Sequence, residues 1–234
     1  MLSSLFDTYD ALIVLDTETT GFRPREDEII ELGFVVLSAD GTEREEDVLI
    51  RLSPGRRLPP RITELTGITE GMLSARGVEK EAAGRLLADA LSAPRPLVAA
   101  YNAQFDLCFL YWFLRRQGLE AALRSARFLD VMTVYKDRRD YPHRLANAVE
   151  AYCVAGENTH RACDDARAAM GVLAAMEAER SDLHEYINLF GYDPRYGPPR
   201  PRIASIRYAP QPTTGAKGCT NKKLLCFPRE AEEL

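Results

Sequence analysis

Two acidic residues close the first apolar run of the chain. Residues 11–15 (ALIVL) have the length and composition of a buried strand, and Asp16 and Glu18 follow with one residue between them. Because alternate residues of a strand point to the same face, the two carboxylates would lie side by side. Neighbouring carboxylates repel each other and are costly to bury, and a divalent cation between them relieves both effects. The pair is compatible with a metal site and also with a solvated turn after a strand, and its spacing alone leaves both open.

Two further groups of polar residues follow later elements. Asp106 comes shortly after the apolar run 97–101, in the first turn of a predicted helix, where an acid also suits the helix dipole. His160 is followed five residues later by Asp165. Residues five apart on one helix point about 140° apart, so these two meet only if His160 precedes the helix. Each group alone also has a structural interpretation, as a helix cap or a solvated first turn.

The elements that must hold these residues begin with a hairpin. Strands are expected at residues 29–37 and 46–52, separated by the Asp40-Gly41 turn signal. Residues 53–61 hold three prolines and a glycine and are expected to be a loop. The later elements are strands at 97–101 and 128–132 and helices at 79–91, 105–117, 145–152 and 161–180. This order predicts an α/β fold in which helices pack on a partly parallel sheet.

Taken together, the three groups of polar residues resemble the motifs of the DEDDh 3′→5′ exonuclease family, whose best-known member is the epsilon proofreading subunit of bacterial DNA polymerase III. Residues 28–33 (EIIELG) and 65–69 (LTGIT) are also similar to that family. The resemblance runs from about residue 10 to residue 177, in family order. It implies a ribonuclease-H-like fold, with a five-stranded mixed sheet flanked by helices.

The resemblance also implies an activity. Such an enzyme hydrolyses phosphodiester bonds at the 3′ end of a single strand and releases nucleoside monophosphates, using two divalent cations, Mg²⁺ or Mn²⁺. The implied metal ligands are Asp16, Glu18, Asp106 and Asp165, and His160 is the implied general base. The residues implied to contact the terminal nucleotide are Thr19, Thr20, Gly21, Asn102 and Phe105.

One position departs from the family, and two histidines lie outside its motifs. The family often has histidine before the asparagine of the second motif, where this chain has Tyr101. That position is not a metal ligand, so only contacts near the terminal nucleotide are in doubt. Position 148, five residues after His143, is an alanine, and His184 follows the last motif. Both histidines are interpreted as surface or capping residues.

Few residues of the sequence distinguish a DNA substrate from an RNA substrate. Thr19 and Thr20 after Glu18 look more like the polymerase-proofreading branch, so DNA, in proofreading or repair, is favoured over RNA. The alternative is an RNA exonuclease of the same family, of the RNase T or oligoribonuclease type, because no residue signals recognition of the 2′-OH. A non-catalytic nucleic-acid-binding adaptor is a further alternative. It would be expected to lack one of the four acids or the histidine, and all five are present.

The overall composition indicates how such a site could bind a substrate and where in the cell the protein is expected. The chain has 234 residues, 46% of them hydrophobic, and a formal net charge of −5. Residues 194–234 carry +5 and residues 1–193 carry −10, so the body needs bound cations or a local basic surface to hold a polyanion. The sequence shows five cysteines without zinc-site spacing, no secretion signal and no apolar run that could span a bilayer. We therefore expect a cytoplasmic protein without membrane contact.

Two parts of the chain are expected, an exonuclease domain over residues 8–188 and a Pro-rich basic tail over residues 189–234. Seven prolines fall between Pro194 and Pro228, and helical periodicity disappears there. Residues 190–208 interleave aromatic rings with arginines. Such an extended segment could pack its rings on the body, contact single-stranded nucleic acid, or bind a partner such as a DNA polymerase subunit.

Overall fold

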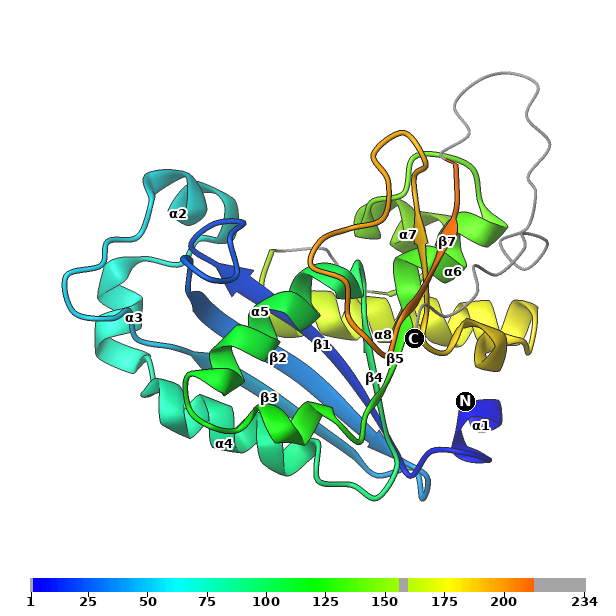
Figure 1. The fold of residues 1–234 in the computed structure, drawn as a ribbon, viewed down its shortest axis with the longest axis horizontal. Helices are drawn as coiled ribbons and strands as arrows, with labels where there is room; N and C mark the ends of the chain where they lie inside the picture. The colour runs from blue at the N-terminus through cyan, green and yellow to red at the C-terminus, as the bar shows by residue number, and fades with distance from the viewer. Residues whose placement is uncertain (1, 156–159, 213–234) are drawn as a thin grey trace.

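A five-stranded mixed sheet lies at the centre of the computed structural model, which describes residues 2–155 and 160–212 (Figure 1). The strands are β1 (Ala11–Thr19), β2 (Ile29–Ser38), β3 (Glu43–Leu49), β4 (Pro96–Ala100) and β5 (Arg127–Asp130). Across the sheet their order is β3-β2-β1-β4-β5. β2 pairs antiparallel with β1 and β3, whereas β4 pairs parallel with β1 and β5. The predicted hairpin and the partly parallel sheet are both confirmed.

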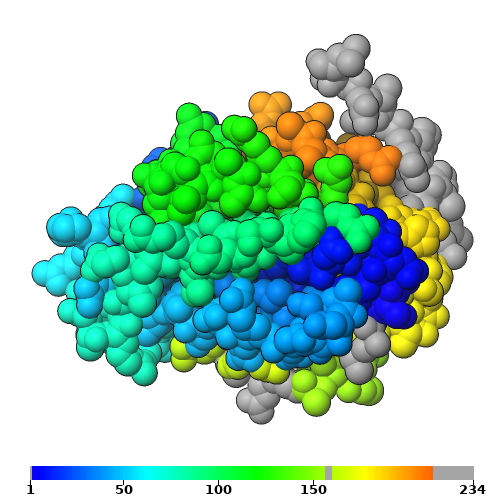
Figure 2. Space-filling model, turned by 90° about the horizontal axis from the view of Figure 1, so that it is seen from below, coloured from blue at the N-terminus to red at the C-terminus, as the bar shows by residue number. Residues whose placement is uncertain are grey.

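Helices cover both faces of this sheet. α4 (Lys80–Ala90) and α5 (Ala103–Arg115) lie side by side over one face, as the two views show (Figure 1, Figure 2). α6 (Val131–Arg138), α7 (Leu145–Ala151) and α8 (Ala162–Glu179) cover the other face. The result is the α/β architecture that the order of elements predicts, with helices on both faces of the sheet.

The two apolar layers meet at β1, the central strand. Ile13 and Leu15 pack into the cluster that includes α4 and α5. Leu12 and Val14 pack into the cluster that includes α8. Strand alternation therefore buries both faces of β1, and a continuous apolar run is the pattern expected of such a strand. The face that holds Leu12 and Val14 continues to residues 16 and 18.

Several short helices lie outside the two main layers of helices. α2 (Pro60–Thr66) and α3 (Glu70–Arg76) cover a smaller apolar cluster that includes Ile30 of β2. The loop expected over residues 53–61 ends earlier than predicted, because Pro60 occupies the first position of α2, where its missing N–H is no loss. The sequence patterns do not predict α2, α3 or α6, which have only seven or eight residues each. The remaining helical segments are α1 (Ser3–Phe6), η1 (Glu120–Leu123) and η2 (Leu183–Tyr186).

The first part of the predicted tail packs onto the body. β6 (Leu189–Tyr192) and β7 (Arg207–Pro210) form a two-stranded parallel sheet. Phe190, Ile206 and Tyr208 are buried in the same cluster as α5, and Figure 2 shows this segment, in orange, beside that helix. Up to residue 212, the interpretation of the tail as a segment draped over the body agrees with the structure for these buried rings, whereas Tyr196 is 83% exposed.

The rest of the tail lies outside the described residues. It comprises residues 213–234, with Cys219 and Cys226, so the second part of the tail stays a prediction. The division of the chain between residues 188 and 189 also stays a prediction. Within the described part of the chain, no helix is both long enough and apolar enough to cross a bilayer.

Candidate active site at the end of β1

Asp16 and Glu18 lie on the face of β1 that packs against α8. They follow Leu12 and Val14 on that face, and both are partly exposed, whereas Thr17 on the opposite face is buried. β1 runs through the whole motif to Thr19 instead of ending before the first acid. Strand alternation therefore places the two carboxylates side by side, as the spacing predicts.

Asp106 reaches the same end of β1 from α5. This helix begins directly after β4, the parallel neighbour of β1, so the carboxyl ends of both strands bring their loops to one edge of the sheet. The carboxyl group of Asp106 is buried, and the Thr17 hydroxyl donates a hydrogen bond of 2.8 Å to its Oδ1. Through this bond the first turn of α5 is attached to the strand that carries Asp16 and Glu18.

His160 and Asp165 complete the cluster from the start of α8. One potential ligand atom from each of Glu18, His160 and Asp165 lies within 4.8 Å of the others. α8 begins at Ala162, so His160 precedes the helix, as its pairing with Asp165 requires. His160 is exposed and has a φ of 54°, in the left-handed region that few non-glycine residues adopt. The chain turns there, and the imidazole lies beside an acid five residues away.

A buried carboxylate on β2 attaches the start of α8 to the sheet. Glu31, opposite Glu18 in the strand pairing, has no exposed surface. The Nε of Arg161 donates to Glu31 Oε1 at 2.8 Å, and the backbone N–H of Ala162 donates to Oε2 at 2.9 Å. Two residues along, a Cβ at Gly33 would lie 2.1 Å from the backbone nitrogen of Cys163, so only glycine permits this approach. Glu31 and Gly33 thus place Asp165 and His160 beside β1.

Sequence reasoning did not assign these supporting residues. Glu31 and Gly33 lie in the stretch 28–33 that resembles the family, and this was the available signal. Thr17 and Arg161 lie inside two of the motifs, but no local pattern shows that one bonds Asp106 and the other bonds Glu31. Both partners are far away in the sequence, so only the folded chain reveals them.

The carboxyl groups raise one another's pKa values. Burial, and then the charge of Asp106, raises the pKa of Asp16 well above its ordinary value. Burial, and then the charge of Asp165, raises the pKa of Glu18 to about 8, with Arg161 acting in the opposite direction. Burial raises the pKa of Asp106 to about 7, although the Thr17 hydrogen bond lowers it. Crowded, partly desolvated carboxylates of this kind fit divalent cations, whose charge offsets the repulsion.

The loop after β1 is held by its own threonines. The Thr19 hydroxyl donates to the carbonyl oxygen of Gly21 at 2.6 Å, and the Thr20 hydroxyl accepts from the Glu28 N–H at 3.0 Å. A Cβ at Gly21 would lie 2.4 Å from a carboxyl oxygen of Asp27, so the loop is closely packed at this glycine. These bonds shape the loop beside the acids. Contact of these three residues with a nucleotide stays a prediction.

The first turn of α5 presents the other two residues predicted to contact substrate. Asn102 is exposed with a φ of 69°, and its backbone N–H donates to Asp130 Oδ1 at 3.0 Å. Phe105 is partly exposed, and its ring centroid lies 6.3 Å from that of Phe22 in an edge-on arrangement. Both residues therefore lie at the start of the helix that carries Asp106, and their role in binding also stays a prediction.

The other histidines and Tyr101 have structural surroundings. The Tyr101 hydroxyl donates to the carbonyl oxygen of His143 at 3.0 Å. Nε2 of His143 lies 3.0 Å from the carbonyl oxygen of Arg139, and burial lowers the pKa of this histidine. His184 is exposed on η2. These surroundings are consistent with surface or capping roles, and neither histidine belongs to the described cluster of potential ligands.

The chain is similar to proteins that process DNA. The RNase T family, described as Exonuclease, matches residues 13–173. The epsilon subunit of DNA polymerase III from Treponema pallidum is 30% identical over 175 residues, which cover 73% of this chain and 78% of that protein. A PolC-type DNA polymerase III from Thermotoga petrophila is 34% identical over 159 residues, which cover 66% of this chain. The chain spans only 11% of that polymerase's length.

Solved structures share the fold. A zinc-bound complex of Escherichia coli exonuclease I with single-stranded DNA matches with a TM-score of 0.68 at 19% identity, covering 76% of this chain and 42% of that chain. The same exonuclease with a dT13 oligonucleotide matches with a TM-score of 0.68 at 18% identity, covering 76% and 43%. At these identities the likeness shows the fold alone. It confirms the ribonuclease-H-like fold that the sequence implies.

Proposed function

The chain belongs to the DEDDh exonuclease family, and from this premise we propose that it hydrolyses phosphodiester bonds at the 3′ end of single-stranded DNA and releases nucleoside monophosphates. The observation that carries the proposal is the grouping of Glu18, His160 and Asp165, whose potential ligand atoms lie within 4.8 Å of one another. Asp16 and Asp106 adjoin this group, since the charges of Glu18 and Asp165 raise the pKa of Asp16, and the charge of Asp106 raises the pKa of Glu18. An acid cluster of this density beside an exposed imidazole suits metal-assisted hydrolysis.

The donor set suits two Mg²⁺ or Mn²⁺ ions. These cations prefer oxygen ligands, and four of the five side chains are carboxylates. In this proposal the carboxylates of Asp16, Glu18, Asp106 and Asp165 would hold the two ions. Two bound cations would supply charge stabilisation for the attacking and leaving oxygens of the phosphodiester.

The remaining side chains would orient the reactants and move a proton. His160 is exposed, and a ring nitrogen lies within 4.8 Å of oxygens of Glu18 and Asp165, so the imidazole is placed to take a proton from the attacking water. A positioned general base typically contributes about 10²–10⁴-fold to the rate. The loop held by Thr19 and Thr20, with Asn102 and Phe105 opposite, would hold the terminal nucleotide in place.

A degradation assay tests polarity and substrate together. Single strands of DNA and RNA with one sequence, labelled at the 5′ end, are incubated with Mg²⁺, with Mn²⁺ or with excess chelator. We expect labelled DNA to shorten stepwise with either cation and to stay intact in chelator. Immediate release of the labelled nucleotide would refute the 3′→5′ polarity. Faster degradation of RNA would favour the RNA exonuclease, and binding without any cleavage would favour the adaptor.

Replacing His160 tests the general base. His160→Gln should lower kcat by about 10²–10⁴-fold at neutral pH with little change in KM, since the proton acceptor is lost while the acids remain. His184→Gln, at an exposed histidine on η2, is the matched control and should keep wild-type rates. The measurement is the initial rate of mononucleotide release. Wild-type activity in the His160→Gln protein would remove histidine from the mechanism.

We also propose a partner protein and a cellular compartment for this activity. Similarity to a polymerase III subunit and to part of PolC-type polymerases supports a DNA polymerase as partner, testable by co-elution with a purified polymerase. Cys108, Cys153 and Cys163 are free thiols, which supports the cytoplasm as the compartment. A disulfide involving any of these three cysteines in the protein isolated from cells would contradict that location.

A further inference from the structure

Three exposed arginines near the candidate active site have no acidic partner in the described part of the chain. They are Arg25 in the loop between β1 and β2, Arg61 on α2, and Arg115 at the end of α5. Two nearby arginines do have acidic partners: Arg23 forms an ion pair with Glu26, and Arg57 forms one with Glu70. In a chain whose net charge is −5, arginines left without carboxylates are available to an external anion.

Aromatic rings hold these guanidinium groups in place. The Cζ of Arg25 lies 4.7 Å from the ring centroid of Trp112, and that of Arg115 lies 5.2 Å from the same ring. Arg61 lies over Phe22 at 5.3 Å. A guanidinium stacked on a ring keeps N–H donors at its edge, where a phosphate could accept them. Stacking therefore orders the positive charges without neutralising them.

These residues form one continuous surface that starts at the acids. Phe22 follows Gly21 in the loop after β1, is 73% exposed, and meets the Phe105 ring next to Asp106. Seven residues further along α5, a rise of about 10 Å, comes Trp112. The backbone of Arg25 is bound to this part of α5, because the side chain of Arg116 donates to its carbonyl oxygen at 2.5 Å. Figure 1 shows the loop between β1 and β2 beside α5, in agreement with this contact.

We propose that this surface binds the single strand on the 5′ side of the nucleotide being removed. We call it the α5 surface and define it by Phe22, Arg25, Arg61, Tyr111, Trp112 and Arg115. Exposed rings stack on bases of any sequence, and ordered arginines bind the phosphates between them. An acidic peptide would need the arginines but not the rings, so nucleic acid is the better fit. The inference rests on the proposed function, since the 3′ end must lie at the acids.

Trp112 reports on this surface directly, because it is the only tryptophan in the chain. The full chain is titrated with oligothymidylates of about 2 and about 12 nucleotides. Chelator is present throughout to prevent cleavage. Only the longer strand is long enough to fill a single-strand binding site. We expect the longer strand to quench Trp112 fluorescence and the dinucleotide to leave it unchanged. The salt dependence of the titration is measured at the same time.

Two substitutions test the arginines. In Arg25→Gln/Arg115→Gln, the Kd for the longer strand should rise about tenfold, and the salt slope should fall by about 0.7 for each arginine removed. Cleavage of a dinucleotide with Mn²⁺ should stay at the wild-type rate, because the acids are untouched. Arg124→Gln is the matched control: Arg124 is exposed and, within the described ranges, forms no ion pair. Circular dichroism checks that all variants fold.

The outcomes separate this inference from the proposed function. An unchanged Kd in the double variant, or no change in Trp112 fluorescence at a saturating strand concentration, overturns the α5 surface even if DNA is degraded. Quenching by polyglutamate but not by oligothymidylate overturns it in favour of an acidic protein partner. Absence of cleavage of every strand with Mn²⁺ refutes the nuclease, whatever Trp112 reports.

Discussion

At the residue scale, the carboxyl group of Glu18 shows how strongly folding changes the pKa of a side chain. Its ordinary pKa of 4.5 rises to about 8, first because of burial and then because of the charges of Asp165 and Glu31. Without a cation the folded protein therefore holds a proton that the unfolded chain releases. When the pH is high and no cation is bound, the ionised carboxylates of the site therefore lower the stability of the folded protein.

This pKa shift predicts a pH dependence of stability. Because the folded-state pKa is the higher one, its stabilising contribution is present below about pH 4.5 and is lost as the pH rises to about 8. In chelator, Tm should fall between about pH 5 and about pH 8, and it should fall less in Glu18→Gln, which cannot titrate. Differential scanning calorimetry at both pH values measures this. Equal slopes in both proteins would show that Glu18 is not perturbed.

Metal binding should have the opposite pH dependence. Protons and cations compete for the same oxygens, so saturating Mn²⁺ should raise Tm more at about pH 8 than at about pH 5. Asp16→Asn, which removes one of the acids proposed to hold the ions, should lose most of this increase. A cation effect of equal size in this variant would place the binding elsewhere.

At the element scale, the position of α8 depends on one glycine. Gly33 of β2 lies against the backbone of α8 at Cys163, and Glu31 bonds the first N–H of the helix. The helix carries Asp165, and His160 directly precedes it. The geometry of the candidate site is thus set by the distance between a strand and a helix whose residues are more than one hundred positions apart.

Gly33→Ala should therefore damage both stability and activity. The added Cβ would meet backbone atoms at 2.1 Å, and backbone has no rotamer by which to move away. We expect the free energy of unfolding to fall by about 1–3 kcal/mol, as in other overpacked sites. Displacing α8 by about 1 Å should also lower kcat about 10²-fold. Urea unfolding and the nuclease assay measure the two effects.

Gly71→Ala on α3 is the control for this substitution. The nearest atom to its Cβ would be the Thr69 hydroxyl oxygen at 3.7 Å, an ordinary contact. Alanine also favours helix over glycine by about 0.8–1 kcal/mol, so this variant should be as stable as wild type or more so. Similar behaviour of the two variants would mean that α8 does not press on β2 at Gly33.

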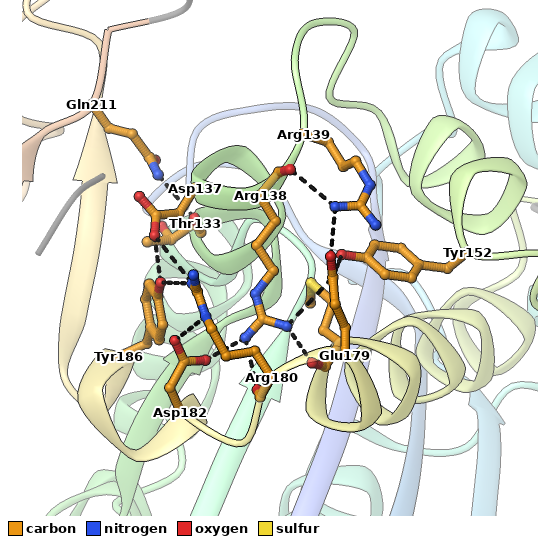
Figure 3. Close-up of polar contacts among 11 residues, drawn as sticks. Thr133, Asp137, Arg138, Arg139, Tyr152, Glu179, Arg180, Asp182, Tyr186 and Gln211 are labelled. Carbon is orange, nitrogen blue, oxygen red and sulfur yellow. Dashed lines mark hydrogen bonds and ion pairs between the residues drawn. The ribbon is translucent and has the colours of Figure 1, made fainter. Parts of the chain in front are cut away.

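At the scale of the whole molecule, a polar network ties the far end of α8 to α6 and η2 (Figure 3). The side chain of Arg138 is 2% exposed and forms ion pairs with Asp182 and, at 3.7 Å, Glu179. Arg139 reaches the same Glu179 at 2.9 Å, and the Tyr186 hydroxyl donates to Asp137 at 2.5 Å. The layer opposite α5 is therefore held by buried charge as well as by apolar contacts.

Arg138→Met should lower the free energy of unfolding by about 1–3 kcal/mol, because Asp182 and the Met176 carbonyl oxygen lose a buried donor, while Arg180 still pairs with Asp182 and Arg139 with Glu179. Arg195→Met is the control, since Arg195 is 65% exposed and its 2.6 Å ion pair with Asp193 lies at the surface. Such pairs contribute about 0–1 kcal/mol. Urea unfolding measures both variants. A loss of less than about 1 kcal/mol at Arg138 would show that water replaces the guanidinium.

Truncation after Asn188 tests the proposed division of the chain. If residues 189–234 were a separable tail, the shortened protein would keep its Tm. Burial of Phe190, Ile206 and Tyr208 instead predicts a lower Tm, since each removed ring or aliphatic side chain takes about 1.5–3 kcal/mol of apolar burial with it. An unchanged Tm would mark the packed segment as dispensable.

Much of this protein follows from its sequence alone. Strand and helix periodicities are local, so the β2–β3 hairpin and the helices α4, α5, α7 and α8 lie within a few residues of their predicted bounds. Strand alternation likewise places Asp16 and Glu18 on one face. The resemblance to the family implied the four acids and His160, whose roles stay predictions. The helix α2 escaped prediction because it begins at Pro60, inside a Pro-rich stretch that predicts a loop.

The tertiary structure alone decided which distant residues meet. Thr17 bonds an acid 89 positions away, and Glu31 bonds a backbone group 131 positions away. The perturbed pKa values, the packing of residues 189–212 and the α5 surface all arise from such contacts. Burial and close approach depend on how separate segments pack, and no periodicity within one segment contains that information.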